Sequence, residues 1–260
     1  MAKEKQPYGT VLIKAASILD YLAESKEPQA LNQIASATDI TNSTTSKILD
    51  TLILIGYVKK NIGTKKYELG SALIKYANQY LANLDISKIA YPYLKKLQVE
   101  LNETIHLGIL EGDEILTINK IESQKPVVCL NSTIGLTKPL YCSAMGKAVL
   151  AIMSDDDINE YLDNIDLRAY TDKTITNKEE LLKEIKDIRK NGYAVDNEEY
   201  EEDVYCIGVA LSLGSQIYGA FSVSVPVYRI TTEESENIVK EMLKTKININ
   251  RELEQHYLFL

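Results

Sequence analysis

Two groups of residues in the second half of the chain have side chains suited to nucleophilic catalysis. Ser143 and Lys147 offer a hydroxyl and a base, and Cys206, His106 and Asp196 can be drawn as a Cys/His/Asp triad. The local sequence supports neither group. The Ser–Lys spacing is one residue longer than S-x-x-K, and no nucleophile-elbow motif surrounds the cysteine. A small-molecule hydrolase that uses Cys206 or Ser143 as its nucleophile is therefore the alternative to a binding function.

Cofactor and metal motifs are absent from the sequence. It has no G-x-G-x-x-G, P-loop or H-E-x-x-H pattern. Its two histidines and three cysteines include no C-x-x-C pair, so we expect no zinc site and no cofactor. Unpaired cysteines, with neither a signal peptide nor an apolar run long enough to span a membrane, predict a cytoplasmic protein with no membrane partner.

Charge is divided unevenly along the chain. The net charge is −8, but residues 1–80 hold ten basic and seven acidic residues, so that segment is about +3 and the rest about −11. A mildly basic head on an acidic body favours a DNA-binding domain joined to a different domain. Because the head is only weakly basic, we expect binding to need more than one copy and to weaken with salt.

The head shows helical periodicity. Apolar residues recur at helical spacing over residues 10–24. A short helix and a turn are predicted over residues 30–40, and a third helix over residues 41–52. Thr41 or Asn42 is the expected N-cap of the third helix, since either side chain can accept a bond from a free backbone N–H. The inner face of that helix is predicted to be Ile48, Leu52 and Ile55.

The outer face of the third helix has the composition that a DNA major groove accepts. It carries small polar residues and one lysine rather than a mixture of Glu and Lys. Residues 57–69 then predict two short strands around an Asn-to-Gly turn with four lysines, the basic wing of a winged helix-turn-helix. A three-helix protein-docking module is the alternative, against which the basic wing argues. The residues expected to contact DNA are Asn42, Ser43, Thr44, Ser46, Lys47, Lys59, Lys60 and Lys65.

The second half of the chain predicts an α+β domain. Strand-like runs occur at 105–110, 115–121, 127–130, 140–142, 193–196, 205–213 and 218–225. Two long helices follow Thr176-x-x-Glu179 and Thr231-x-x-Glu234, each of which has the spacing of a capping box. Paired strands with separated helices indicate an antiparallel sheet with helices on its faces.

Motifs along nearly the whole chain resemble the IclR family of bacterial transcriptional regulators. Each motif is weak alone, but their order and spacing together are specific. In the first half they are residues 13–23, Ser43-Thr44 followed by Lys47-Ile48-Leu49, Gly56-Tyr57-Val58 and Tyr67-Glu68-Leu69-Gly70. In the second half they are Glu103-Thr104-Ile105-His106-Leu107, Gly112-Asp113-Glu114, residues 139–148, residues 192–199 and Cys206-Ile207.

The resemblance implies three segments. These are a winged helix-turn-helix at residues 1–70, a linker helix at 71–84 that helps form a dimer, and a GAF-like effector-binding domain at 85–260. It also implies that a small metabolite binds at the segment beginning with Ser143 and at three strands. The expected effector-binding residues are Ser143, Ala144, Met145, Gly146, Asp196, Cys206, Ser222 and Ser224.

Sequence features suggest the chemistry of that effector. Ser222 and Ser224 alternate with apolar residues, so both point to one face of their strand. Residues 143–147 begin a helix after a strand-like run, and N–H groups at such a position bind anions. With no arginine nearby in sequence, a carboxylate would be held by N–H groups and hydroxyls. The acids Asp196, Glu198, Glu199 and Asp203 favour a sugar acid or polyol.

The expected function is a transcriptional regulator, a repressor of a metabolic operon. It would bind double-stranded operator DNA as a homodimer or homotetramer, because paired heads read two half-sites. A sugar acid or a small keto or hydroxy acid would modulate its operator affinity. We therefore predict that the chain is not an enzyme.

Overall fold

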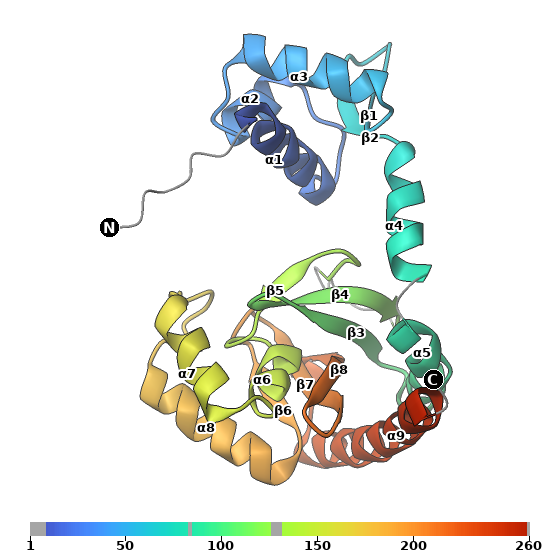
Figure 1. Cartoon of the computed structure of the whole chain (residues 1–260), viewed down its shortest axis with the longest axis vertical. Coiled ribbons are helices and arrows are strands. Elements are labelled where there is room, and N and C mark those ends of the chain that lie inside the picture. Colours follow the sequence, from blue (N-terminus) through green and yellow to red (C-terminus); the bar gives the residue numbers. More distant parts are fainter. Residues whose placement is uncertain (1–8, 83–84, 126–131, 259–260) are drawn as a thin grey trace. The chain divides into compact units, whose positions relative to one another are not determined.

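The computed structural model describes residues 9–82, 85–125 and 132–258 (Figure 1). The chain divides into two compact units, Met1–Asn83 and Leu84–Leu260. The predicted strand at residues 127–130, and Cys129 within it, lie outside the described residues. No helix in the described ranges is long and apolar enough to cross a membrane.

The first unit contains three helices, a two-stranded hairpin and a fourth helix. They are α1 (Thr10–Glu24), α2 (Leu31–Ala37), α3 (Asn42–Leu54), β1 (Val58–Lys60), β2 (Tyr67–Leu69) and α4 (Ala72–Ala82). The helices enclose one apolar core in which Ile18, Ile34 and Leu49 are fully buried. Because the apolar stripes of α1–α3 face that core, the polar stripe of α3 is left at the surface.

The ends of α3 follow from local chemistry. Thr41 is its N-cap, and its Oγ1 accepts a bond from the Thr44 N–H at 3.4 Å, as the sequence predicts. The prediction that Ile55 lies on the inner face is wrong. Ile55 is 49% exposed at the C-cap, and Leu49 takes an inner position instead. Beyond the cap the chain leaves the helical path, so the 3.6-residue period no longer applies there.

The second unit is built on one antiparallel sheet of six strands in the order β5-β4-β3-β8-β7-β6. The strands are β3 (Thr104–Glu111), β4 (Glu114–Ile121), β5 (Thr137–Pro139), β6 (Ala194–Asn197), β7 (Val204–Leu213) and β8 (Gln216–Pro226). The helices are α5 (Asp85–Leu101), α6 (Ala144–Leu150), α7 (Asp155–Asn164), α8 (Lys178–Asn191), η1 (Val227–Arg229) and α9 (Thr232–Leu258). The predicted α+β class with an antiparallel sheet is confirmed.

Helices cover both faces of this sheet (Figure 1). One face contacts α6, which also packs on α8, and the other contacts α9, which pairs with α5. Gly208 on β7 allows α6 to approach closely, since a Cβ there would lie 2.4 Å from the carbonyl carbon of Ala144. Successive residues of β7 and β8 therefore face two different environments.

Two local predictions for this unit are wrong and one is confirmed. Residues 140–142 form a turn rather than a strand, and the strand lies just before them at β5. The N-cap of α8 is Asn177 rather than Thr176, and its Oδ1 accepts bonds from the N–H groups of Glu179 and Glu180 at 2.9 and 3.1 Å. The Thr231 capping box is present, with the Glu234 N–H 3.2 Å from Thr231 Oγ1.

Candidate DNA-reading surface and effector cavity

The expected DNA-contacting residues of α3 lie on its outer side. Thr45, Ile48, Leu49 and Leu52 are buried on the opposite side. Asn42, Ser43 and Lys47 are exposed, and Thr44 and Ser46 are half-buried at the edge of the outer face. A helix with a polar, sterically small outer face can enter a major groove and place its hydroxyl, amide and ammonium groups against base edges.

One of these α3 residues also stabilises the start of the helix. The Thr44 N–H bonds to Thr41 Oγ1, and the two threonine hydroxyls lie 3.0 Å apart. This pairing holds the first turn of α3 in a defined geometry. Thr44 therefore serves the fold as well as the surface, which its residue type alone does not reveal.

The three predicted lysines of the wing differ in their surroundings. Lys59 pairs with Glu68 across the hairpin at 3.3 Å, and Lys60 lies 4.9 Å from the ring centroid of Tyr67. Lys65 is exposed in the turn with a φ of 57°. Lys59 is thus partly neutralised.

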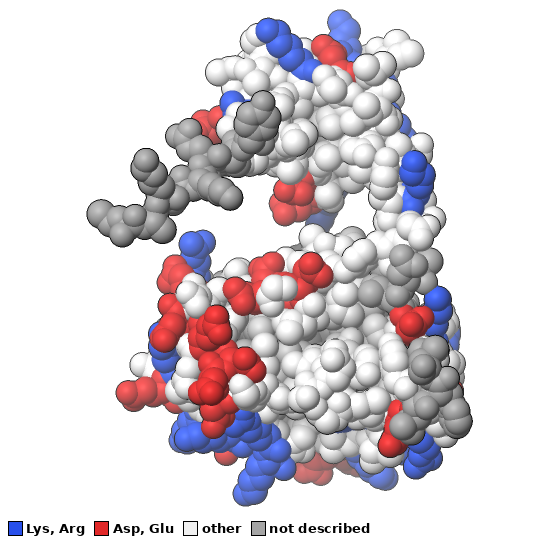
Figure 2. All heavy atoms as spheres, in the orientation of Figure 1, with Lys and Arg blue, Asp and Glu red and all other residues white. Residues whose placement is uncertain are grey.

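The visible face of the larger unit, by contrast, carries a dense group of acidic side chains (Figure 2).

A small polar cavity of about 20 Å³ lies between the sheet and the start of α6. Seven of the eight expected effector-binding residues line it: Ser143, Ala144, Met145, Asp196, Cys206, Ser222 and Ser224. Gly146 is not part of the lining. Its N–H bonds to Ser143 Oγ at 3.2 Å, and a Cβ there would come within 2.4 Å of the Cα of Leu140. The structure thus brings together residues from four separate segments of the sequence.

The lining includes four residues that were not predicted to bind the effector. They are His106, Thr117, Ser132 and Lys138, from β3, β4, the loop before β5, and β5. His106 is paired across the sheet with Ser222, so strand pairing was the signal that could have found it. Lys138 corrects the expectation that a carboxylate would meet only N–H groups and hydroxyls, since an ammonium group also lines the cavity.

A chain of hydrogen bonds crosses the cavity. His106 Nε2 is 2.7 Å from Ser132 Oγ, and its Nδ1 is 3.3 Å from Ser224 Oγ, which is in turn 3.1 Å from Cys206 Sγ. Burial, with smaller effects of Lys138 and Lys120, lowers the pKa of His106 to about 3, so the imidazole is neutral.

The same burial controls the cysteine. Desolvation, with a smaller effect of Asp196, raises the pKa of Cys206 to about 12. The sulfur is therefore a thiol at neutral pH, whereas nucleophilic catalysis needs a thiolate. The neutral imidazole beside it lies against hydroxyl groups and offers no positive charge to stabilise a thiolate. The Cys/His/Asp triad is therefore not formed: the two ring nitrogens of His106 bond to Ser132 and Ser224, and Cys206 stays a thiol.

The Ser143–Lys147 pair fails as a catalytic group for geometric reasons. Ser143 Oγ donates to the Pro139 carbonyl at 2.9 Å and caps α6. Lys147 is fully buried and forms ion pairs with Glu184 and with Glu199, the latter at 2.5 Å. Burial lowers the pKa of Lys147, but the two carboxylates outweigh it and the net shift is upward. A lysine held charged in this way is no general base for the serine.

Asp196 is the one acidic residue of the predicted group that lines the cavity. Its Oδ1 accepts a bond from the Glu199 N–H at 2.8 Å, and burial raises its pKa to about 6. Glu199 pairs with Lys147 instead, Glu198 pairs with Lys173, and Asp203 does not line the cavity. The argument for a polyol from four nearby acids therefore reduces to one carboxylate. Among the described residues, no cluster of His, Cys, Asp and Glu is arranged to hold a metal ion.

A winged helix-turn-helix with a polar recognition helix and a sheet domain with a polar cavity together define a ligand-responsive DNA-binding regulator. The chain matches the family model of the IclR helix-turn-helix domain over residues 11–61. It also matches the model described as bacterial transcriptional regulator IclR C-terminal over residues 78–251. The chain belongs to the IclR family of bacterial transcriptional regulators.

Individual relatives agree with this assignment. The chain is 32% identical over 256 residues to the HTH-type transcriptional regulator KdgR of Escherichia coli (strain K12), covering 97% of this chain and 96% of KdgR. The crystal structure of the Thermotoga maritima IclR has a TM-score of 0.76 and 31% identity, over 95% of this chain and 99% of that one.

A third comparison extends the likeness in fold. An IclR homologue from Microbacterium hydrocarbonoxydans, crystallised in complex with 4-hydroxybenzoate, has a TM-score of 0.77 and 21% identity over 94% of this chain and 99% of that one. The family consists of transcriptional regulators and not enzymes, so neither the hydrolase nor the docking-module alternative is supported.

Proposed function

We propose that this regulator represses a metabolic operon and is controlled by a small hydroxylated carboxylic acid bound in the cavity beside α6. The observation that carries the proposal is the composition of the cavity lining. Within it one ammonium group, one carboxylate, a neutral imidazole and several hydroxyls converge on one enclosed space. Such a set recognises a molecule that carries a carboxylate and hydrogen-bonding hydroxyls.

Each part of the effector has a counterpart in the lining. The Lys138 ammonium suits the effector carboxylate, and the Asp196 carboxylate accepts a bond from an effector hydroxyl. Ser222 and Ser224, which lie two residues apart on β8, offer hydroxyls that both donate and accept. A sugar acid or a small hydroxy or keto acid fits this pattern better than a hydrocarbon or a dianion.

The size of the cavity implies that the effector changes the structure. About 20 Å³ has room for roughly one water molecule, and a metabolite is several times larger. Binding must therefore separate α6 from the strands or displace side chains of the lining. A ligand that requires a different arrangement shifts the balance between two states of the protein, as control of DNA affinity demands.

The proposed DNA contacts are the exposed polar residues of α3 and the lysines of the β1–β2 wing. The half-site would be read by α3 in the major groove, and the wing would contact phosphates. Two copies, as a homodimer or within a homotetramer, would then bind a palindromic operator. We propose domain boundaries at 1–70, 71–84 and 85–260, with the segment 71–84 carrying the effector response between the domains.

A gel-shift titration on DNA upstream of the regulator's own gene tests this proposal. We expect a saturable shift that unlabelled site DNA competes away and that bulk DNA does not. A hydroxy or sugar acid should move the midpoint, and the matching polyol without the carboxylate should not. A specific shift that no carboxylic acid alters would contradict the effector class, and no specific shift would contradict the choice of operator.

The double variant Ser222→Ala with Ser224→Ala separates sensing from DNA binding. We expect it to lose the effector response while it keeps the operator affinity of the wild type. Ser212→Ala, on β7 and outside the cavity lining, is the matched control and should respond normally. Loss of DNA binding together with the response would show that the two serines have a structural role.

A further inference from the structure

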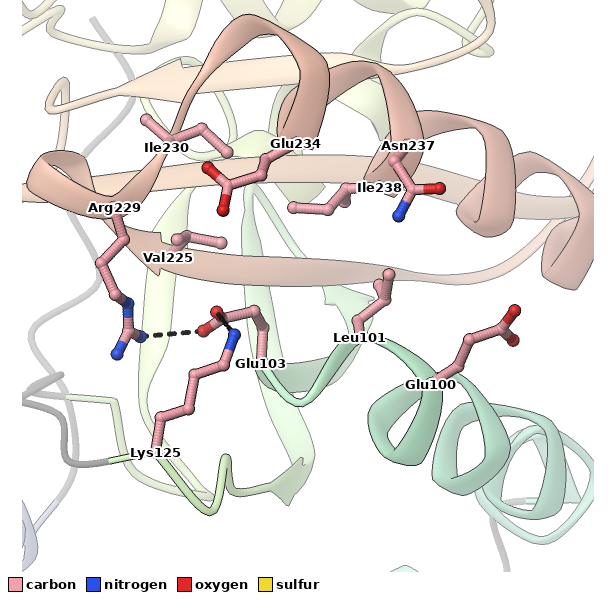
Figure 3. Close-up of a pocket in the computed structure, with 10 residues that line it drawn as sticks. All are labelled: Glu100, Leu101, Glu103, Lys125, Val225, Arg229, Ile230, Glu234, Asn237 and Ile238. Atoms are coloured by element: carbon pink, nitrogen blue, oxygen red, sulfur yellow. Dashed lines mark hydrogen bonds and ion pairs between the residues drawn. The ribbon is translucent and has the colours of Figure 1, made fainter.

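A second cavity, larger than the first, lies in the same unit (Figure 3). Its volume is about 110 Å³, and it lies between the end of α5, the end of β8 and the first turns of α9. Val225 lines it, whereas the preceding residue Ser224 lines the proposed effector cavity. Because successive strand residues point to opposite faces, the two cavities are separate sites that share the strand β8 as a wall.

One side of the second cavity is a built cationic corner. Glu103 is 5% exposed, and its carboxylate is held by Lys125 Nζ at 2.6 Å and by Arg229 Nη2 at 2.9 Å. Two cations therefore meet a single buried carboxylate at this corner. A buried carboxylate fixes both cations in place, so the corner is already arranged to receive an anion.

The rest of the lining has a different character. Apolar side chains of Leu101, Val225 and Ile238 lie between the cationic corner and Glu100 on the other side (Figure 3). Glu234 and Asn237, on the first turns of α9, complete the edge. Glu234 accepts bonds from the N–H and the hydroxyl of Thr231, both at 2.9 Å, so its carboxylate is held in place at the rim.

We propose that this second cavity binds a small zwitterionic amino acid. The carboxylate of the ligand would meet Lys125 and Arg229, its ammonium group would face the rim carboxylates Glu100 and Glu234, and its short aliphatic side chain would rest on the apolar residues. The cavity has a volume of about 110 Å³ and opens to solvent beside the exposed residues Glu100, Glu234 and Asn237, so it suits a ligand as small as alanine. The site is additional to the proposed effector cavity and does not depend on it.

Calorimetric titration of the full chain with L-alanine tests the assignment. We expect saturable binding of alanine, and binding at least roughly tenfold weaker for propionate, which lacks the ammonium group, and for ethylamine, which lacks the carboxylate. No saturable heat with alanine at millimolar concentrations would overturn the proposal. Equal binding of propionate would also overturn it, because the site would then recognise an anion alone.

Two pairs of variants locate the binding. Asn237→Phe places a ring at the mouth of the cavity and should abolish alanine binding, whereas Glu236→Phe, beside it on the exposed side of α9, should not. Lys125→Gln should weaken binding roughly tenfold, and the exposed Lys240→Gln should leave it unchanged. Alanine that binds equally well to Asn237→Phe and Glu236→Phe would place its site elsewhere.

Discussion

Helix α3 of the first unit and the interior of the second unit around α6 use the same residue types in opposite ways. In α3, Ser43 and Lys47 are exposed polar groups on a helix whose other face is apolar. In the second unit, Lys147 is fully buried between two carboxylates, and Ser222 and Ser224 are almost fully buried. An exposed polar residue can bind a partner molecule, whereas the charge and hydrogen bonds of a buried polar residue are set by the groups that surround it.

Burial explains why the polar side chains inside the second unit are joined by so many hydrogen bonds and ion pairs. A buried polar group without a partner destabilises the fold by a few kcal/mol, so such groups are found in pairs and chains. His106, Ser132, Ser224 and Cys206 form one such chain. Under the proposed function, an effector that enters the cavity would have to replace existing bonds, whereas DNA that meets α3 would displace mainly water and counterions.

The largest difference in the effect of a substitution on stability is expected between Lys147 and Lys47. Lys147→Met leaves the buried Glu199 without its cation and should lower the free energy of unfolding of the second unit by about 3–5 kcal/mol. Lys47→Met should change stability by less than about 0.5 kcal/mol. Urea denaturation at pH 8 measures both.

Adding Glu199→Gln to Lys147→Met serves as the internal check on that prediction. Removal of the second charge should recover part of the lost stability, because no unpaired buried carboxylate remains. A loss below about 1 kcal/mol for Lys147→Met alone would mean that the ion pairs contribute little beyond packing.

The next effect concerns pH and the buried imidazole. The pKa of His106 is about 3 in the folded protein and 6.5 when unperturbed, so below pH 6.5 the unfolded chain binds a proton that the folded protein does not. Its stabilising effect is therefore present above pH 6.5 and is lost progressively toward pH 3. Between pH 7 and pH 5, the destabilisation caused by His106→Gln should shrink by about 2 kcal/mol.

Asp196 acts in the opposite direction. Its raised pKa of about 6 favours the folded state at low pH and ceases to do so as the pH rises through 6. Because Asp196 is present in both wild type and His106→Gln, the difference between their urea denaturation curves isolates the histidine. Parallel pH dependence of the two proteins would contradict a neutral buried His106.

DNA affinity is expected to depend on Lys47 more than on charge alone. Lys47→Ala should weaken operator binding roughly tenfold, as the loss of one positioned contact does, without unfolding the first unit. Lys14→Ala, an exposed lysine of α1, removes the same charge from the same unit. Equal losses for the two variants in a fluorescence-anisotropy titration would reduce the role of Lys47 to general electrostatics.

The smallest effects are expected in the wing. Lys59 already pairs with Glu68, so Lys59→Gln should weaken operator binding only a few-fold and less than Lys65→Gln does. Glu68→Gln should strengthen binding slightly, because it removes a negative charge beside the phosphates. The dependence of log affinity on log salt concentration measures these changes, and a larger loss for Lys59→Gln would show that its pairing with Glu68 breaks on DNA.

Prediction from sequence succeeded where a pattern is local and repeated. The apolar spacing of α1–α3 and the Thr231 capping box were predicted correctly because they depend on residues three or four positions apart. Prediction failed where two adjacent residues can both serve as an N-cap, as Thr176 and Asn177 can before α8. It also failed at residues 140–142, where a buried apolar turn has the composition of a strand.

The sequence by itself determined the family, the order of the elements in the first unit and the polar outer face of α3, because periodicity decides which side of a helix is exposed. Only the tertiary structure decided the cavities. Strand pairing brings His106, Lys138 and Cys206 together from distant segments, and burial keeps the histidine and the cysteine neutral. Proximity and dielectric environment depend on the packing of the whole domain, which no local pattern in the chain encodes.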